Sequence, residues 1–174
     1  MTLPSEDASR RTLMLAAAAS LVTVAAPVAA APRELKLADL KKEADVACVY
    51  HCDYGAPARF AQTLTNISNH YSAYGADPFA LQIALVAHGP SVKFFLDELA
   101  GTPWKDETIP PDIARQIDDV AKNGLKVHLC EITFSRLKLD KAKVREAEFV
   151  SFVPSGVATV AALQAKGFAY LKVG

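Results

Sequence analysis

From residue 46 onward, short apolar segments alternate with amphipathic ones, and this alternation limits the folds that the chain can adopt. The apolar segments that read as strands are 46–51, 79–89, 125–131, 148–154 and 168–173. Two of them follow directly on a helix-ending pair, Asn-Gly at 123–124 and Lys-Gly at 166–167. Strands separated by helices are joined by crossovers, which makes the strands parallel and puts helices on both faces of the sheet. The sequence therefore predicts an α/β fold, a three-layer α/β/α sandwich around a mainly parallel sheet of about five strands.

The helices between these strands are predicted from the spacing of apolar residues and from end signals. Residues 57–75 place apolar side chains along one helical face. Residues 91–101 read as a helix, with Ser91 as its cap and Gly101 as its end. Further helices are expected over 113–122, in the first part of 132–147, and over 156–166 behind a Ser155 cap.

The first 30 residues have a different composition from the rest of the chain. A paired arginine precedes an Ala/Leu/Val segment and then small residues, which is the layout of a cleaved secretory signal. The stretch "SRRTLML" at 9–15 resembles the twin-arginine export signal. Polar residues and a proline interrupt the apolar segment, so we expect cleavage near Ala30 and no stable membrane insertion afterwards. We expect a periplasmic protein with this organisation: a twin-arginine signal peptide at 1–30, a polar entry segment at 31–45, and one α/β domain at 46–174.

Composition and missing motifs exclude several classes of function. The 174 residues are 51% apolar, which suits one well-buried domain. Lysine plus arginine and aspartate plus glutamate number 19 each, and no basic run occurs, so no nucleic-acid partner is expected. The chain contains no GxGxxG, GxxxxGK[ST] or GxSxG motif. Nucleotide binding and α/β-hydrolase chemistry are therefore not predicted, and no cofactor is expected.

The predicted architecture brings chemically active residues to one edge of the sheet. In open parallel sheets, ligands bind outside the carboxyl ends of the strands. Three predicted strands end in polar or sulfur-containing residues: His51, Cys52 and Asp53; His88 and Gly89; Cys130 and Glu131. This convergence is the main functional signal in the sequence.

The cysteines have different expected roles. Cys48 lies within a strand, where a free cysteine behaves as a small buried hydrophobe. Cys130 ends a strand in which Lys126 and His128 alternate with apolar residues, so we expect that strand at a sheet edge or a subunit contact. Cys130 is either a reactive thiol, stabilised by the start of the following helix, or a buried unreactive one.

The remaining candidates leave alternatives open. Cys52 could pair with Cys130, act as a second reactive thiol, or border a turn. His88 could orient or deprotonate a thiol, or simply precede a tight turn at Gly89.

Asp53 and the metal-ligating residue types complete the set of candidates. Asp53 could cap the following helix or interact with His51. Zinc or copper would suit a ligand set drawn from the histidines and cysteines at the strand ends, namely His51, Cys52, His88 and Cys130. No CxxC or HxxxH spacing supports this set, so no metal site is predicted.

Four segments of the chain resemble the DsrE/DsrF-like family, and more narrowly its exported single-domain branch. They are "YHCDYGAPARFAQTLTNISNHYSAYGAD", "LVAHGPSVKFFLDELAGTPW", "KNGLKVHLCEITF" and "SFVPSGVATVAALQAKGFAYLKV". The similarity covers roughly residues 44–173. It implies a parallel α/β/α sandwich that assembles into a homo-oligomer, a trimer or hexamer. Some members of this family are sulfur carriers that pass persulfide sulfur from thiol to thiol.

The resemblance also implies roles for individual residues. By position, the family's sulfur-bearing cysteine corresponds to Cys130. The expected function is a periplasmic sulfur relay whose partners are sulfur donor and acceptor proteins or small sulfane-sulfur compounds. The alternatives are a non-catalytic oligomeric binding or assembly protein and a metal or small-molecule binder. In the relay interpretation, the residues around the thiol are His88 and Lys93 as its positive environment, Cys52 as a resolving or partner thiol, and His51, Asp53 and Gly89 as binding residues.

Overall fold

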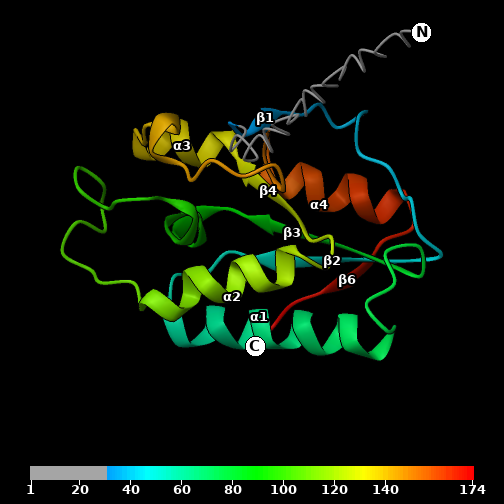
Figure 1. Cartoon of the computed structure of the whole chain (residues 1–174). Coiled ribbons are helices and arrows are strands. Elements are labelled where there is room, and N and C mark those ends of the chain that lie inside the picture. The colour runs from blue at the N-terminus through cyan, green and yellow to red at the C-terminus, as the bar shows by residue number, and fades with distance from the viewer. Residues whose placement is uncertain (1–30) are drawn as a thin grey trace, which may run out of the picture.

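A single sheet of six parallel strands runs through residues 31–174, the part of the chain that this computed structural model describes (Figure 1). The strands are β1 (Arg33–Glu34), β2 (Val46–Cys52), β3 (Leu81–Ala87), β4 (Lys126–Cys130), β5 (Val150–Val153) and β6 (Ala169–Leu171). Their order across the sheet is β1-β5-β4-β3-β2-β6, and every neighbouring pair is parallel. The α/β prediction is confirmed. The signal peptide expected at residues 1–30 lies outside the described residues.

The sixth strand comes from the segment expected to be a polar entry. β1 pairs with β5, and Leu40 of the same segment is buried. Gln82 of β3 holds this segment: its side chain accepts a hydrogen bond from the Glu43 backbone at 2.7 Å and donates one to the Lys41 carbonyl at 3.0 Å. A two-residue charged strand has no apolar alternation, which is why the sequence pattern did not predict it.

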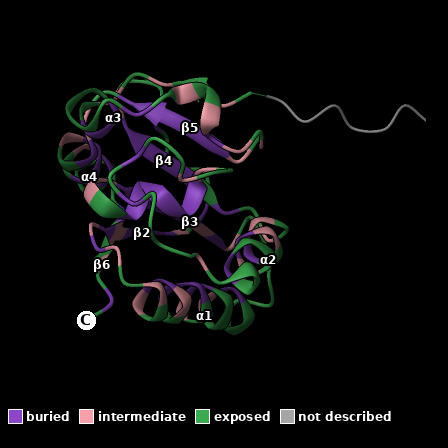
Figure 2. Ribbon diagram, turned by 90° about the vertical axis from the view of Figure 1, so that its left-hand side faces the viewer, coloured by how far each residue is buried: buried purple, intermediate pink, exposed green. Residues whose placement is uncertain are grey.

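Helices cover both faces of the sheet. The helices α1 (Pro57–Ala73) and α2 (Pro111–Ala121) pack against each other on one face, and α4 (Gly156–Ala165) covers β2, β3 and β4 on the other (Figure 1). The short helix α3 (Glu131–Leu137) starts where β4 ends. Figure 2 shows the central strands β3, β4 and β5 mostly buried between the outer helices. Within the described residues, no helix combines the length and the apolar character needed to cross a membrane.

The end signals of the helices are confirmed at the positions that determine the chain path. The Ser155 hydroxyl accepts a hydrogen bond from the Ala158 backbone at 3.4 Å and caps α4. Gly124 and Gly167 follow α2 and α4 with φ values of 94° and 90°. Residues other than glycine rarely adopt such backbone angles, so each glycine allows the helix to end and the next strand to begin.

The helix predicted over 91–101 is wrong in type and extent. The structure has a 3₁₀ helix, η1 (Gly89–Phe95), and the chain is extended at Leu96, which forms an antiparallel bridge with Val144. All five residues from Ser91 to Phe95 are buried. An α-helix lying on a sheet buries one side, so a segment buried on all sides does not match the amphipathic helix that was predicted. The Ser91 hydroxyl donates to the Cys52 and His88 carbonyls at 2.7 and 2.9 Å and caps no α-helix.

Of the two alternatives for 125–131, a sheet edge or a subunit contact, the sheet edge is wrong. β4 lies between β3 and β5 in the middle of the sheet. Its polar residue His128 is buried, and its Nδ1 atom lies 2.8 Å from the Ser151 hydroxyl of β5. A polar side chain is tolerated in a central strand because it has this hydrogen-bond partner.

Candidate functional site

Four of the predicted site residues project from the same face at the carboxyl ends of the strands. Along β2 and β3, Val49 and Val86 pack on the α4 face, so alternation places His51, Asp53 and His88 on that face too. The strand register pairs Cys52 with Ala87 and Ala87 with Leu129. Continued by one residue, this register places Asp53 next to His88 and His88 next to Cys130 along the sheet. We call His51, Asp53, His88 and Cys130 the carboxyl rim.

The two histidines of the carboxyl rim are in direct contact. Their Nε2 atoms lie 2.6 Å apart, and the ring centroids are 4.9 Å apart with an angle of 25° between the ring planes. The Nδ1 atom of His51 lies 2.8 Å from the Tyr170 hydroxyl on β6. Burial lowers the pKa of both histidines, and proximity to His88 lowers that of His51 further. Both imidazoles are therefore mainly neutral at pH 7.

Asp53 completes a compact group with these histidines. It pairs with Lys172, the Oδ2–Nζ distance being 2.8 Å. Burial acts against ionisation of Asp53, but the hydrogen bond and charge of Lys172 outweigh it and lower the pKa of the carboxyl. One nitrogen from each histidine and a carboxylate oxygen all lie within 4.8 Å of one another. Asp53 does not cap α1, because the N-cap is Ala56 and no side chain bonds there.

Cys130 is the last residue of β4 and the N-cap of α3. Only 5% of its surface is exposed. The Gly89 backbone donates a hydrogen bond to the Thr133 hydroxyl at 2.9 Å, which ties the start of α3 to the end of β3. This hydrogen bond ties the backbone after Cys130 to the residue that follows His88, while the thiol itself is buried.

Cys52 lies on the other face of the sheet. It has no exposed surface and packs in the core cluster beneath α1 and α2 together with Cys48, which is buried as expected. Burial raises the pKa of the Cys52 thiol to about 11, although hydrogen bonds from Tyr54 and Ser91 oppose that shift, and burial also raises the pKa of Cys48. All three cysteines are free. The sheet separates Cys52 from Cys130, so the structure does not bring these two thiols together.

Lys93, which was predicted to act near the Cys130 thiol, has a different partner. Lys93 is buried in η1, beside Gly55 and the Phe94 ring, and its ammonium pairs with Glu107. Its charge is thus compensated locally.

Sequence reasoning missed the outer partners of the carboxyl rim. Tyr170 and Lys172 alternate along the last strand segment, and both contact rim residues. Their spacing of two was the available signal, because it puts them on one face of a strand. It could not be used without knowing that β6 pairs with β2.

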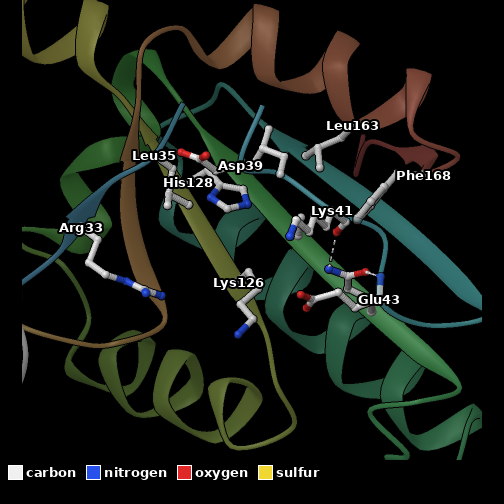
Figure 3. A pocket seen from close by; sticks show the side chains of 12 residues that line it. Arg33, Leu35, Asp39, Lys41, Glu43, Lys126, His128, Leu163 and Phe168 are labelled. Carbon is white, nitrogen blue, oxygen red and sulfur yellow. Dashed lines mark hydrogen bonds between the residues drawn. The ribbon is translucent and has the colours of Figure 1, made fainter. Parts of the chain in front are cut away.

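A separate cavity of about 230 Å³ lies on the α4 face, towards the amino ends of the strands (Figure 3). His128 lines it together with charged side chains of both signs, among them Arg33, Asp39, Glu43 and Lys126. Burial, and secondarily the Lys126 charge, lower the pKa of His128 to about 4. His128 is therefore a neutral member of this cavity and is not part of the carboxyl rim.

Replacing Gly156 by alanine is expected to displace the His88 ring. A Cβ atom at Gly156 would lie 2.9, 3.0 and 3.1 Å from the His88 Cβ, Cδ2 and Cγ atoms. Overpacking of this kind costs about 1–3 kcal/mol, and the helix preference of alanine returns up to about 1 kcal/mol. We expect the free energy of unfolding, measured with urea, to fall by about 1 kcal/mol. We also expect the NMR signal of the His88 imidazole to shift.

The matched control is Gly174→Ala, because no atom lies within 4 Å of a Cβ at that position. It should change neither quantity. An unchanged His88 signal in Gly156→Ala would show that the ring is not held by this contact.

Comparisons with known proteins bear on the whole chain. The sequence model of the DsrE/DsrF-like family matches residues 2–173. A solved structure of a protein of unknown function from Methanobacterium thermoautotrophicum superposes with a TM-score of 0.57 and 20% identity. The match covers 74% of this chain and 99% of that one, and at this identity it shows the fold alone. Among curated proteins, none matches this chain.

Proposed function

The chain belongs to the DsrE/DsrF-like family, and from that premise we propose that it is a sulfur-relay protein that carries persulfide sulfur on Cys130. Some members of this family pass sulfur between thiols. One observation carries the proposal. Cys130 is the last residue of the central strand β4, and it lies at the same carboxyl end of the sheet, and on the same face, as His51, Asp53 and His88.

The chemistry requires one exchange in each direction. The Cys130 thiolate attacks the outer sulfur of a donor persulfide, R–S–SH. The donor S–S bond breaks, R–S⁻ leaves, and a new S–S bond forms on Cys130, so that the product is Cys130–S–SH. An acceptor thiolate then removes the outer sulfur by the same reaction and regenerates the Cys130 thiolate. No external oxidant or reductant is consumed in either step.

The neighbouring histidine has a defined place in this scheme. Because His88 is mainly neutral at pH 7, it can accept the proton of the Cys130 thiol. Lys93 has no role in the proposal, since Glu107 compensates its charge. Cys52 has none either, because it lies in the opposite core cluster.

Three exposed apolar residues adjoin the carboxyl rim and support a protein partner. Ile132 lies on α3 two residues beyond Cys130, Val157 follows Gly156 in the first turn of α4, and Tyr170 contacts His51. Val157 is the most exposed of them, at 66%. Exposed apolar residues gathered around a reactive group are typical of an interaction surface. We propose that sulfur donor and acceptor proteins dock here, that small sulfane-sulfur compounds also load the thiol, and that the chain works as a homo-oligomer in the periplasm.

Intact mass measurement tests the proposal directly. Full-length protein is expressed in a bacterial host, recovered from its periplasm and incubated with thiosulfate or polysulfide. We expect a gain of one sulfur atom in the wild type and in Cys52→Ser, and no gain in Cys130→Ser. With thiosulfate, the balanced reaction converts Cys130–SH to Cys130–S–SH and releases sulfite, which is assayed in parallel. The same spectra show whether the chain begins near Ala31, as cleavage of the signal would require.

Two controls keep the result interpretable. Cys52→Ser matches Cys130→Ser in chemistry but lies in the core, so its melting temperature is compared as well. Sulfur uptake that survives in Cys130→Ser would refute the proposal. No uptake by the folded wild type from either compound would favour a non-catalytic binding or assembly role.

A further inference from the structure

We propose that His51, Asp53 and His88 form a binding site for one divalent transition-metal ion of the zinc class. The three residues come from two adjacent strands and their exits, β2 and β3, and all are partly buried. Their candidate ligand atoms, two imidazole nitrogens and one carboxylate oxygen, lie within 4.8 Å of one another. Imidazole and carboxylate together suit Zn²⁺, Fe²⁺ and related ions.

The contact between the histidines places two potential ligand atoms side by side, where a cation can take the place of the hydrogen that one of them carries. Their Nε2 atoms point at each other across 2.6 Å. A neutral imidazole carries one nitrogen lone pair, so two facing lone pairs repel unless a proton or a cation lies between them. Zinc binds histidine nitrogen at about 2.0–2.1 Å, so both Nε2 atoms reach one ion if the rings separate by less than about 1 Å.

Outer contacts orient both rings. The Tyr170 hydroxyl lies 2.8 Å from Nδ1 of His51. If Nδ1 carries the hydrogen and donates it to Tyr170, the lone pair of His51 is on Nε2, facing His88. Metal-binding histidines are commonly held in this way through their second nitrogen. The His88 ring packs against Gly156 at the start of α4, where a larger residue would collide with it.

The charge of Lys172 sets a limit on affinity. Lys172 binds the Oδ2 atom of Asp53 at 2.8 Å, so one oxygen of this carboxylate already has a cationic partner. A positive ammonium next to the same carboxylate repels a divalent cation. Removing this charge is therefore expected to strengthen metal binding.

The ligand set has three protein groups and an open position. Three-ligand zinc sites keep a further position for water or a substrate, whereas structural zinc sites are closed by four protein ligands. The Cys130 thiol is not one of the three clustered groups. Because His88 serves both proposals, sulfur loading is compared with and without added zinc, whereas the metal site is tested in Cys130→Ser, which keeps all three ligands.

The test is a titration of the full chain, purified without a polyhistidine tag and stripped with EDTA. Zn²⁺ is titrated in competition with a chromophoric chelator, and Co²⁺ is used as an absorbing probe. We expect a single equivalent to bind. Tyr170→Phe should weaken binding about 10- to 100-fold, the usual effect of losing an outer partner. The ligand variants should lose more than that, and Lys172→Met should bind more tightly. The ligand variants are His51→Ala, His88→Ala and Asp53→Asn.

The controls separate this site from other zinc-binding groups. His70→Ala removes a part-buried histidine from α1 and should bind as the wild type does. Cys130→Ser should also retain binding, and the Co²⁺ spectrum should lack sulfur-to-metal charge transfer. Where an alanine variant does not fold, His51→Gln and His88→Gln replace it. Absence of binding to the folded wild type, or binding that survives in the ligand variants, overturns the proposal. So does a thiolate band that disappears in Cys130→Ser.

Discussion

Phe60→Ala is expected to lower the free energy of unfolding by about 3–5 kcal/mol, the range for removing a large aromatic side chain from a core. Phe60 has no exposed surface. Its ring stacks on Phe94 with centroids 4.1 Å apart and meets Phe95 edge-on at 5.8 Å. These contacts fasten α1 to η1, which starts directly after His88. Urea unfolding followed by circular dichroism measures the loss.

Phe79→Ala is the matched control for this prediction. It removes the same side chain from a position that is 79% exposed, so a change within about 0.5 kcal/mol is expected. Equal losses in the two variants would show that the stacked phenylalanines contribute no more to stability than a surface residue does.

Acidification from pH 7 to pH 4 is expected to destabilise the protein through His128. Burial lowers the pKa of His128 in the folded state to about 4, whereas an unfolded histidine titrates near 6.5. Below about pH 6.5 the unfolded chain binds a proton that the folded chain does not bind until about pH 4. Stability is therefore complete above that window and falls as the pH drops through it. The loss attributable to His128 approaches about 3 kcal/mol at the lower end.

His128→Asn isolates this effect. Asparagine does not titrate, and its amide can still bond the Ser151 hydroxyl, which lies 2.8 Å from Nδ1 of His128. The variant should be less stable than the wild type at pH 7, because it loses ring volume, but should lose about 3 kcal/mol less on acidification to pH 4. The carboxylates titrate in both proteins, so the difference between their urea midpoints is the quantity to measure.

His70→Asn provides the comparison for a less buried histidine. His70 lies partly buried on α1, and burial lowers its pKa as well. We expect a smaller change in acid sensitivity there, because its desolvation is less complete. Equal acid sensitivity in the wild type and His128→Asn would refute the assignment to His128.

Much of the fold follows from local patterns. Each of the five expected strands is present, as are the helices after Pro57, Pro111 and Ser155. These elements could be predicted because alternation and helical periodicity are properties of neighbouring residues. The charged strand β1 and the 3₁₀ helix at 89–95 escaped prediction, since both depend on what packs against them.

The sequence predicted which residues form the site, but not which of them contact one another. Strand ends supplied His51, Asp53, His88 and Cys130, because parallel strands bring their carboxyl ends to one edge. The pairing of Asp53 with Lys172 could not be predicted, because the two residues are 119 positions apart and no local pattern links them.

The sequence by itself determined that this chain forms a parallel α/β sandwich with histidine, aspartate and cysteine at one edge of its sheet. Only the tertiary structure decided that Cys52 faces the α1 and α2 side while Cys130 shares a face with His88, and that β4 is central. The physical reason is that alternation fixes which residues of one strand share a face, but not how that face aligns with another strand. That alignment is set by strand order and register, which arise from contacts between segments far apart in the chain.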